Sequence, residues 1–231
     1  MGKMKLFCIP HAGASAYYYL PLKDKLENVD VEFIELKGRG RRLNEDLYHS
    51  FSEAVDDVYR QIREKCTGDY AIMGHSMGSL LTYEVYYKLL NNRLPLPKCL
   101  FFSSKEAPLE HLDKIHAEKL SENGLERIIR NLGGFDELEA LNPEMKRFFY
   151  EIIRSDFNIL DEYEYSEPAE KISCKVVVMA GSMESNLSYS HLRKWQELVE
   201  NQISYYSFSG NHFYMKNQWK ELADVIEANL K

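Results

Sequence analysis

The stretch 74–78, which reads Gly-His-Ser-Met-Gly, restricts the possible folds of this chain more than any other segment. It has the form Gly-x-Ser-x-Gly and separates an apolar strand-like run, 69–73, from a helix-like run, 78–92. A serine at such a turn is held in a strained backbone conformation with its hydroxyl exposed, and the flanking glycines let strand and helix approach closely. The pattern therefore predicts a nucleophilic serine at Ser76.

Strand-like and helix-like runs alternate on both sides of this turn. The expected strands are 4–9, 31–36, 69–73, 99–103, 175–180 and 203–208, and the expected helices are 17–27, 51–66, 78–92, 188–200 and 217–230. Such alternation predicts an α/β fold with a mainly parallel sheet and right-handed crossovers.

The region from 108 to about 167 interrupts the alternation. It contains only helical runs, at 118–131, 143–154 and 155–163. We expect residues 1–231 to form a single domain, with this block inserted as a helical lid over the carboxyl edge of the sheet, where ligands bind in such folds.

A serine hydroxyl needs a base within hydrogen-bond reach, and the base needs an orienting acid. In the α/β-hydrolase chain order both follow the serine. His212 comes directly after the last expected strand, at the sheet edge where the Ser76 turn must lie, and is the predicted base. His111, His116 and His191 fall on the lid or on a helix and are interpreted as solvent-facing.

The acid is expected in the loop 181–187, which follows the fifth strand. Glu184 is the only carboxylate in that loop and is the first candidate. Glu106, after the strand 99–103, is the alternative, because some hydrolases carry the acid one strand earlier. The residues alone leave both open.

An oxyanion hole needs two backbone donors near the nucleophile. The N–H of Met77, directly after Ser76, is one candidate. The second is expected from the loop 11–13 after the first strand, with Ala12 as first choice. His11 is interpreted as shaping this loop.

The composition is that of an acidic chain of ordinary globular character. Its 231 residues include 29 basic and 36 acidic side chains, so the net charge is −7. This charge argues against non-specific nucleic-acid binding. No apolar run reaches the roughly 18 residues of a membrane span. Neither a signal peptide nor a metal-ligand spacing, dinucleotide fingerprint or phosphate loop is recognisable, so we expect no cofactor and no metal.

The cysteines form no C-x-x-C pair and indicate reduced, structural thiols in a cytoplasmic protein. They are Cys8, Cys66, Cys99 and Cys174. No feature requires more than a monomer. The basic side chains Arg39, Arg41 and Arg42 fit either a solvated loop or a contact with an anionic group such as a phosphate.

Several stretches together resemble the type II thioesterases of non-ribosomal peptide and polyketide synthesis, members of the α/β-hydrolase superfamily. The matching stretches, in the family's order, are 7–13, 37–42, 74–78, 132–134, 154–157 and 210–213. The resemblance implies hydrolysis of acyl or aminoacyl thioesters on the phosphopantetheine arm of carrier proteins, with an acyl-enzyme on Ser76 and water activated by His212. Two positions depart from the family pattern: Glu184 stands where aspartate is usual, and Ala14 where a second glycine is common.

Two other functions fit the same residues. One is a carboxylesterase or lipase-like hydrolase of small esters. The other is a hydrolase-fold binding protein with weakened catalysis, which the missing aspartate in the loop 181–187 suggests.

Overall fold

The computed structural model describes residues 3–109, 114–134, 138–184 and 187–231. Its centre is a six-stranded sheet with strand order β2-β1-β3-β4-β5-β6, and every neighbouring pair is parallel. The strands are β1 Met4–Ile9, β2 Val29–Phe33, β3 Tyr70–His75, β4 Cys99–Ser103, β5 Lys175–Gly181 and β6 Ser204–Phe208. The predicted α/β-hydrolase architecture is confirmed.

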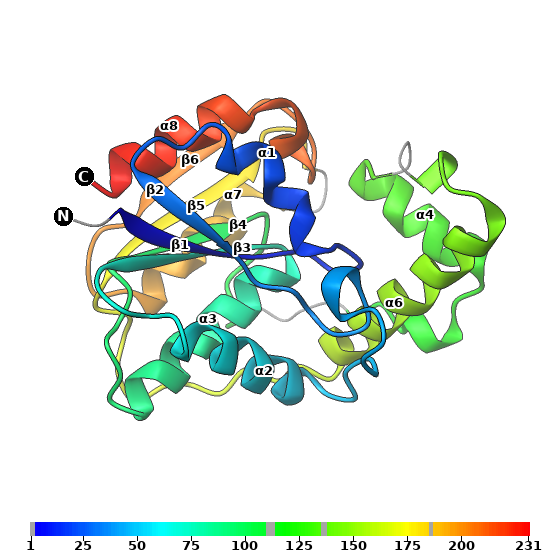
Figure 1. Ribbon diagram of the computed structural model, residues 1–231, viewed down its shortest axis with the longest axis horizontal. Helices are drawn as coiled ribbons and strands as arrows, with labels where there is room; N and C mark the ends of the chain where they lie inside the picture. The colour runs from blue at the N-terminus through cyan, green and yellow to red at the C-terminus, as the bar shows by residue number, and fades with distance from the viewer. Residues whose placement is uncertain (1–2, 110–113, 135–137, 185–186) are drawn as a thin grey trace.

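Helices cover both faces of the sheet (Figure 1). Helices α2 Phe51–Arg63 and α3 Met77–Asn91 lie on one face, and α1 Leu20–Lys23 and α8 Trp219–Asn229 on the other. The shorter helices are η1 Ala16–Tyr19, η2 Gly40–Arg42, η3 Ala117–Lys119, α7 Tyr189–Arg193, η4 Lys194–Leu198 and η5 Tyr214–Asn217.

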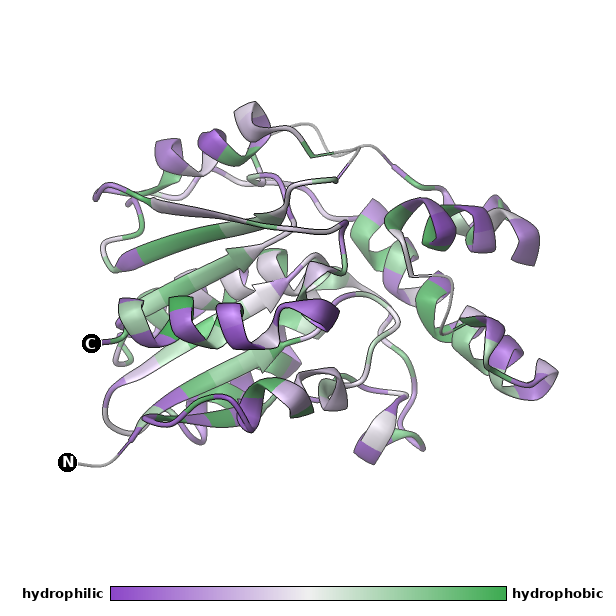
Figure 2. Cartoon of the chain, turned by 90° about the horizontal axis from the view of Figure 1, so that it is seen from above, coloured by the Kyte–Doolittle hydropathy of each residue, from purple (hydrophilic) through white to green (hydrophobic). Residues whose placement is uncertain are grey.

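The alternating pleat of the strands divides the core into two layers. Phe7 and Ile72, which are paired in register, pack with side chains of α2 and α3. The adjacent pair in the register, Leu6 and Ala71, lies on the opposite face of the sheet and packs with side chains of α1 and α8. Figure 2 shows the apolar strands enclosed between helices that carry their hydrophilic residues outward. Parallel strands buried on both faces are necessarily apolar along their length.

A helical segment follows β4 and precedes β5. Its main helices are α4 Glu122–Leu132 and α6 Pro143–Asp161, and they lie beyond the carboxyl ends of the strands (Figure 1). The Asn142 side chain caps α6 by accepting from the Met145 amide, and Pro143 stands at the first helical position, where its missing N–H leaves no hydrogen bond unmade. We refer to the described residues 114–134 and 138–161 as the helical segment.

Several element predictions need correction: the helix expected at 118–131 is the short η3 followed by α4, and that expected at 188–200 is α7 followed by η4. The runs 143–154 and 155–163 form one continuous helix, because no glycine or proline interrupts them. The strand expected at 31–36 is β2, Val29–Phe33, because pairing with β1 ends at Cys8 and Phe33. The helix expected over 17–27 is reduced to the short η1 and α1.

Candidate active site

Ser76 occupies a tight turn between β3 and α3. Its backbone angles, φ 53° and ψ −118°, lie in a region that L-residues rarely adopt. The glycines on either side are needed for space: a Cβ on Gly74 would lie 2.0 Å from the carbonyl oxygen of Gly78, and a Cβ on Gly78 would lie 2.3 Å from that of Ile9. The second contact brings the end of β1, and the loop that follows it, next to Ser76.

His212 and Glu184 meet at the carboxyl edge of the sheet. The distance from His212 Nδ1 to Glu184 Oε2 is 3.0 Å, and the two side chains are 10% and 5% exposed. Their loops are joined through the backbone, since the Met183 amide donates to the Gly210 carbonyl over 2.8 Å. A Cβ on Gly181 would lie 2.2 Å from the Asn211 carbonyl oxygen, so only glycine permits this approach. In the tautomer whose Nδ1–H donates to Glu184, the His212 imidazole keeps Nε2 as an acceptor.

Glu106, the alternative acid, has a different partner. Its Oε1 lies 2.6 Å from Lys105 Nζ in a partly buried ion pair. Of the two carboxylates that the sequence left open, the one in contact with the His212 imidazole is that of Glu184.

Two amides of the loop after β1 are engaged within the protein. The Gly13 amide donates to Asp156 Oδ2 over 2.7 Å, and the Ala14 amide donates to the His11 carbonyl over 3.2 Å. The amide of Ala12 precedes both. On the other side, Met77 is the first residue of α3, where a backbone N–H has no acceptor within its own helix.

The arginines of 39–42 are engaged within the protein. Arg39 is 2% exposed and binds Asp156 through both terminal nitrogens, at 2.5 and 2.8 Å. Arg42 binds Asp57 and Glu45. Neither sequence interpretation is right for Arg39: it is not on a solvated loop, and its guanidinium is already paired with a carboxylate.

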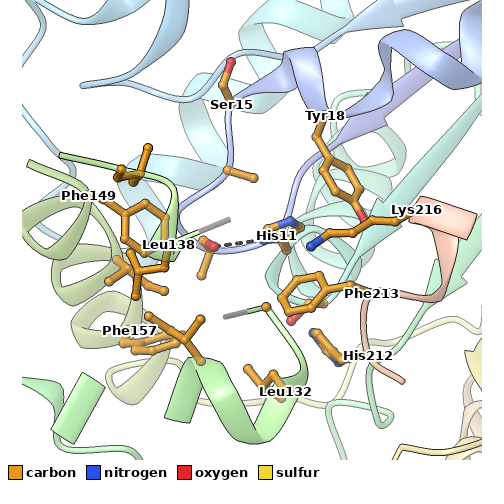
Figure 3. Close-up of a pocket in the computed structure, with 17 residues that line it drawn as sticks. His11, Ser15, Tyr18, Leu132, Leu138, Phe149, Phe157, His212, Phe213 and Lys216 are labelled. Carbon is orange, nitrogen blue, oxygen red and sulfur yellow. Dashed lines mark hydrogen bonds between the residues drawn. The ribbon is translucent and has the colours of Figure 1, made fainter. Parts of the chain in front are cut away.

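Ser76 and His212 line the same cavity, of about 310 Å³, between the sheet edge and the helical segment. Figure 3 shows His11, Tyr18, Phe213 and His212 on one side of it and side chains of the helical segment opposite them. The apolar residues that the helical segment contributes are Ile129, Leu132, Leu138, Leu141, Phe149, Ile153 and Phe157. The cavity is thus apolar along one wall and has polar, reactive groups along the other.

Two further histidines adjoin His212 and are held neutral by their surroundings. Burial lowers the pKa of His11 from 6.5 to about 3, against the opposing effect of the bond between its Nδ1 and the Ala12 carbonyl. Burial also holds the pKa of His75 well below its ordinary value. The His75 Nδ1 lies 2.9 Å from Ser103 Oγ, which in turn contacts the Tyr214 hydroxyl at 2.8 Å.

Sequence reasoning assigned no role to two residues that support the site. Ser104, just after β4, donates a hydrogen bond to Glu184. Asp156 in α6 joins the helical segment to Arg39 and to the loop after β1. Asp156 lies within the matching stretch 154–157, which could have indicated its role. No feature of the sequence indicated a role for Ser104.

Metal-ligating side chains come together once among the described residues, at His116, Glu118 and Asp161. The group is largely exposed, and the Asp161 carboxylate already accepts the amides of Ile115 and His116. These bonds account for the position of Asp161 without a metal. His111 lies outside the described residues.

A parallel sheet with a serine on the turn after one central strand and a histidine after the last strand defines the α/β-hydrolase class. Within it, this chain belongs to the thioesterase domain family, whose model matches residues 4–230. It is therefore a thioester hydrolase.

Named relatives agree with this assignment. The chain is 27% identical to thioesterase PikA5 of Streptomyces venezuelae over 229 residues, covering 98% of this chain and 81% of that protein. It is 27% identical to gramicidin S biosynthesis protein GrsT of Aneurinibacillus migulanus over 235 residues, with 99% and 90% covered.

Solved structures are similar over the same length. ClbQ from the colibactin NRPS/PKS pathway matches with a TM-score of 0.93 at 25% identity, covering 99% of this chain and 97% of that one. The type II thioesterase BorB from the borrelidin biosynthetic cluster matches with a TM-score of 0.89 at 26% identity, with 99% and 93% covered. No helix within the described ranges is both long and apolar enough to cross a membrane.

Proposed function

We propose that this enzyme hydrolyses acyl or aminoacyl thioesters on the phosphopantetheine arm of carrier proteins and so clears stalled or misprimed carriers in non-ribosomal peptide or polyketide synthesis. The observation that carries the proposal is the contact of His212 with Glu184 at 3.0 Å, together with the cavity that His212 and Ser76 both line. The names of the relatives, which belong to gramicidin S, colibactin and borrelidin pathways, support the substrate class.

The reaction follows from the roles of the polar groups. Ser76 Oγ attacks the thioester carbonyl while His212 Nε2 accepts the hydroxyl proton, and Glu184 stabilises the imidazolium that forms. The amides of Met77 and Ala12 donate to the oxyanion of the tetrahedral intermediate. Collapse breaks the carbon–sulfur bond, and His212 returns its proton to the departing phosphopantetheine thiol.

Deacylation repeats these steps with water as nucleophile. His212 removes a proton from the water as it attacks the ester carbon of the acyl-Ser76 intermediate, and then protonates Ser76 Oγ as the free acid leaves. The apolar wall of the helical segment, which acts as a lid, holds the acyl chain away from solvent. No cofactor or metal takes part in these reaction steps.

The test is steady-state hydrolysis of an acyl-phosphopantetheinyl carrier protein by three variants. We expect Ser76→Ala to lower kcat by on the order of 10⁶-fold and Glu184→Gln by on the order of 10⁴-fold, as loss of the nucleophile and of the acid does in other triads. Glu106→Gln is the matched control and should stay near the wild-type rate. Full activity in Ser76→Ala would rule out Ser76 as the nucleophile.

The same assay separates the other functions. We expect the carrier-bound thioester to be cleaved with a much higher kcat/KM than a p-nitrophenyl ester, whereas the reverse order would indicate a small-ester hydrolase. Labelling of Ser76 by a fluorophosphonate would exclude a catalytically weakened binding protein.

A further inference from the structure

Ser104, the first residue after β4, has an unusual backbone for its type. Its φ is 51°, in the left-handed region that favours glycine. It is 3% exposed, and its amide donates to the Met179 carbonyl over 2.8 Å, which fixes the main chain beside β5. Residues other than glycine are strained in this conformation, so a serine there calls for a compensating contact.

That contact is with the carboxylate that faces His212. The Ser104 hydroxyl donates to Glu184 Oε1. The Gly181 amide donates to the same oxygen over 2.9 Å. The other oxygen, Oε2, lies 3.0 Å from His212 Nδ1. The two donors on Oε1 thus fix the plane of the carboxylate and direct Oε2 at the imidazole.

A glutamate needs this restraint more than an aspartate would. Its extra methylene adds a rotatable bond, and each additional torsion leaves the carboxylate a wider range of positions. Among the described residues of its own loop, Glu184 Oε1 accepts from the Gly181 amide. Ser104 approaches from β4, a different strand, so its hydroxyl restrains the carboxylate from a second direction.

We propose that Ser104 is a positioning residue that makes a glutamate effective as the orienting acid in this enzyme. The inference rests on the proposed function, because it assigns to Ser104 an effect on catalysis through Glu184 and His212. The hydrogen bond from Ser104 to Glu184 explains both why a serine stands at a position with left-handed backbone and how a glutamate can orient His212.

The test compares Ser104→Gly with wild type. Glycine accepts the positive φ, so the variant keeps the main chain and loses only the hydroxyl. We expect kcat to fall about 10- to 100-fold, the range for losing a hydrogen bond to a charged group, with KM unchanged. The melting temperature should change little, because the relief of backbone strain offsets the lost hydrogen bond. The matched control is Arg93→Gly: Arg93 is exposed, has φ 55° and lies after α3, so its substitution should leave kcat unchanged.

A double-mutant cycle separates positioning from a general structural role. If Ser104 acts through Glu184, Ser104→Gly should change kcat less than threefold when Glu184 is already glutamine. The downfield proton resonance of His212 Nδ1–H should broaden or shift in Ser104→Gly and stay unchanged in Arg93→Gly. Equal losses in both backgrounds, or a wild-type kcat in Ser104→Gly, would overturn the inference.

The proposed function has a separate readout in the same assay. An active Ser76→Ala variant would defeat the proposed function itself. An inactive Ser76→Ala together with a fully active Ser104→Gly would defeat only the positioning role.

Discussion

At the scale of single residues, the site depends on buried polar groups whose protonation is set by their surroundings. His11 and His75 pack edge to face, with ring centroids 5.5 Å apart, and His75 lies 5.0 Å from His212. The Nε2 atoms of His11 and His75 are shielded from solvent and have no hydrogen-bond partner among the described residues. A proton on either would add a buried charge beside the proposed base, so both rings stay neutral.

His11 should therefore make the protein sensitive to mild acid. Its pKa is about 3 when folded, below the ordinary 6.5 of the unfolded chain, so the unfolded state binds the extra proton. The stability that His11 contributes is complete above pH 6.5 and is lost as the pH falls towards 3. We expect His11→Gln to flatten the decline in unfolding free energy below pH 6.5 by up to about 1.4 kcal/mol per pH unit.

Urea titrations at intervals between pH 7 and 5 would measure this difference, since few carboxylates titrate in that range. Parallel curves for wild type and His11→Gln would show that His11 is protonated in the folded state.

At the scale of elements, α6 has two functions along one side. Phe149, Ile153 and Phe157, spaced four residues apart, form a stripe that lines the cavity. Asp156, beside that stripe, accepts hydrogen bonds from both the Arg39 guanidinium and the Gly13 amide. One carboxylate thus connects the helical segment, the loop after β2 and the loop that carries Ala12.

Removing this carboxylate should affect stability and catalysis separately. Asp156→Ala leaves the buried Arg39 charge unpaired, and we expect it to lower the unfolding free energy by about 3–5 kcal/mol. Combining Asp156→Leu with Arg39→Met removes both charges and should restore most of that loss. We expect kcat to stay reduced in the double variant, because the Gly13 amide still lacks its acceptor and the Ala12 loop is less well fixed.

Urea unfolding and steady-state kinetics on the same samples would test this. A double variant with recovered stability and a wild-type kcat would mean that Asp156 serves the fold alone.

At the scale of the whole molecule, the cavity exists because two parts of the chain close around it. The sheet edge supplies Ser76 and His212, and the helical segment supplies the apolar wall. The segment contacts the His212 loop at Gly133, where a Cβ would lie 1.9 Å from the Asn211 side-chain nitrogen. The shape of the cavity is therefore set partly by residues remote in sequence from Ser76 and His212.

Enlarging this cavity should change acyl preference. Phe149→Ala removes a ring from the apolar wall, and we expect it to raise kcat/KM for a long acyl chain relative to acetyl by about tenfold. Phe148→Ala is the matched control, because Phe148 is 42% exposed and is not among the residues that line the cavity. Competition assays with acetyl- and decanoyl-loaded carrier protein would measure the ratio. The same ratio in both variants would place the acyl chain elsewhere.

The sequence by itself predicted the fold because its signals are local. Apolar runs alternate with amphipathic ones, and Gly74 and Gly78 flank a serine between a strand and a helix. These patterns depend on neighbours in the chain, so the parallel sheet and the Ser76 turn follow from residue order. The position of His212 after the last strand follows in the same way, since parallel strands end at one edge.

Only the tertiary structure decided which carboxylate meets His212 and what the arginines do. Glu184 and Glu106 both follow strands, and the choice depends on backbone bonds between the loops after β5 and β6. Burial of Arg39 depends on Asp156, 117 positions away in sequence. Such pairings are set by loop conformation and long-range packing. The left-handed backbone of Ser104 likewise cannot be predicted from its residue type.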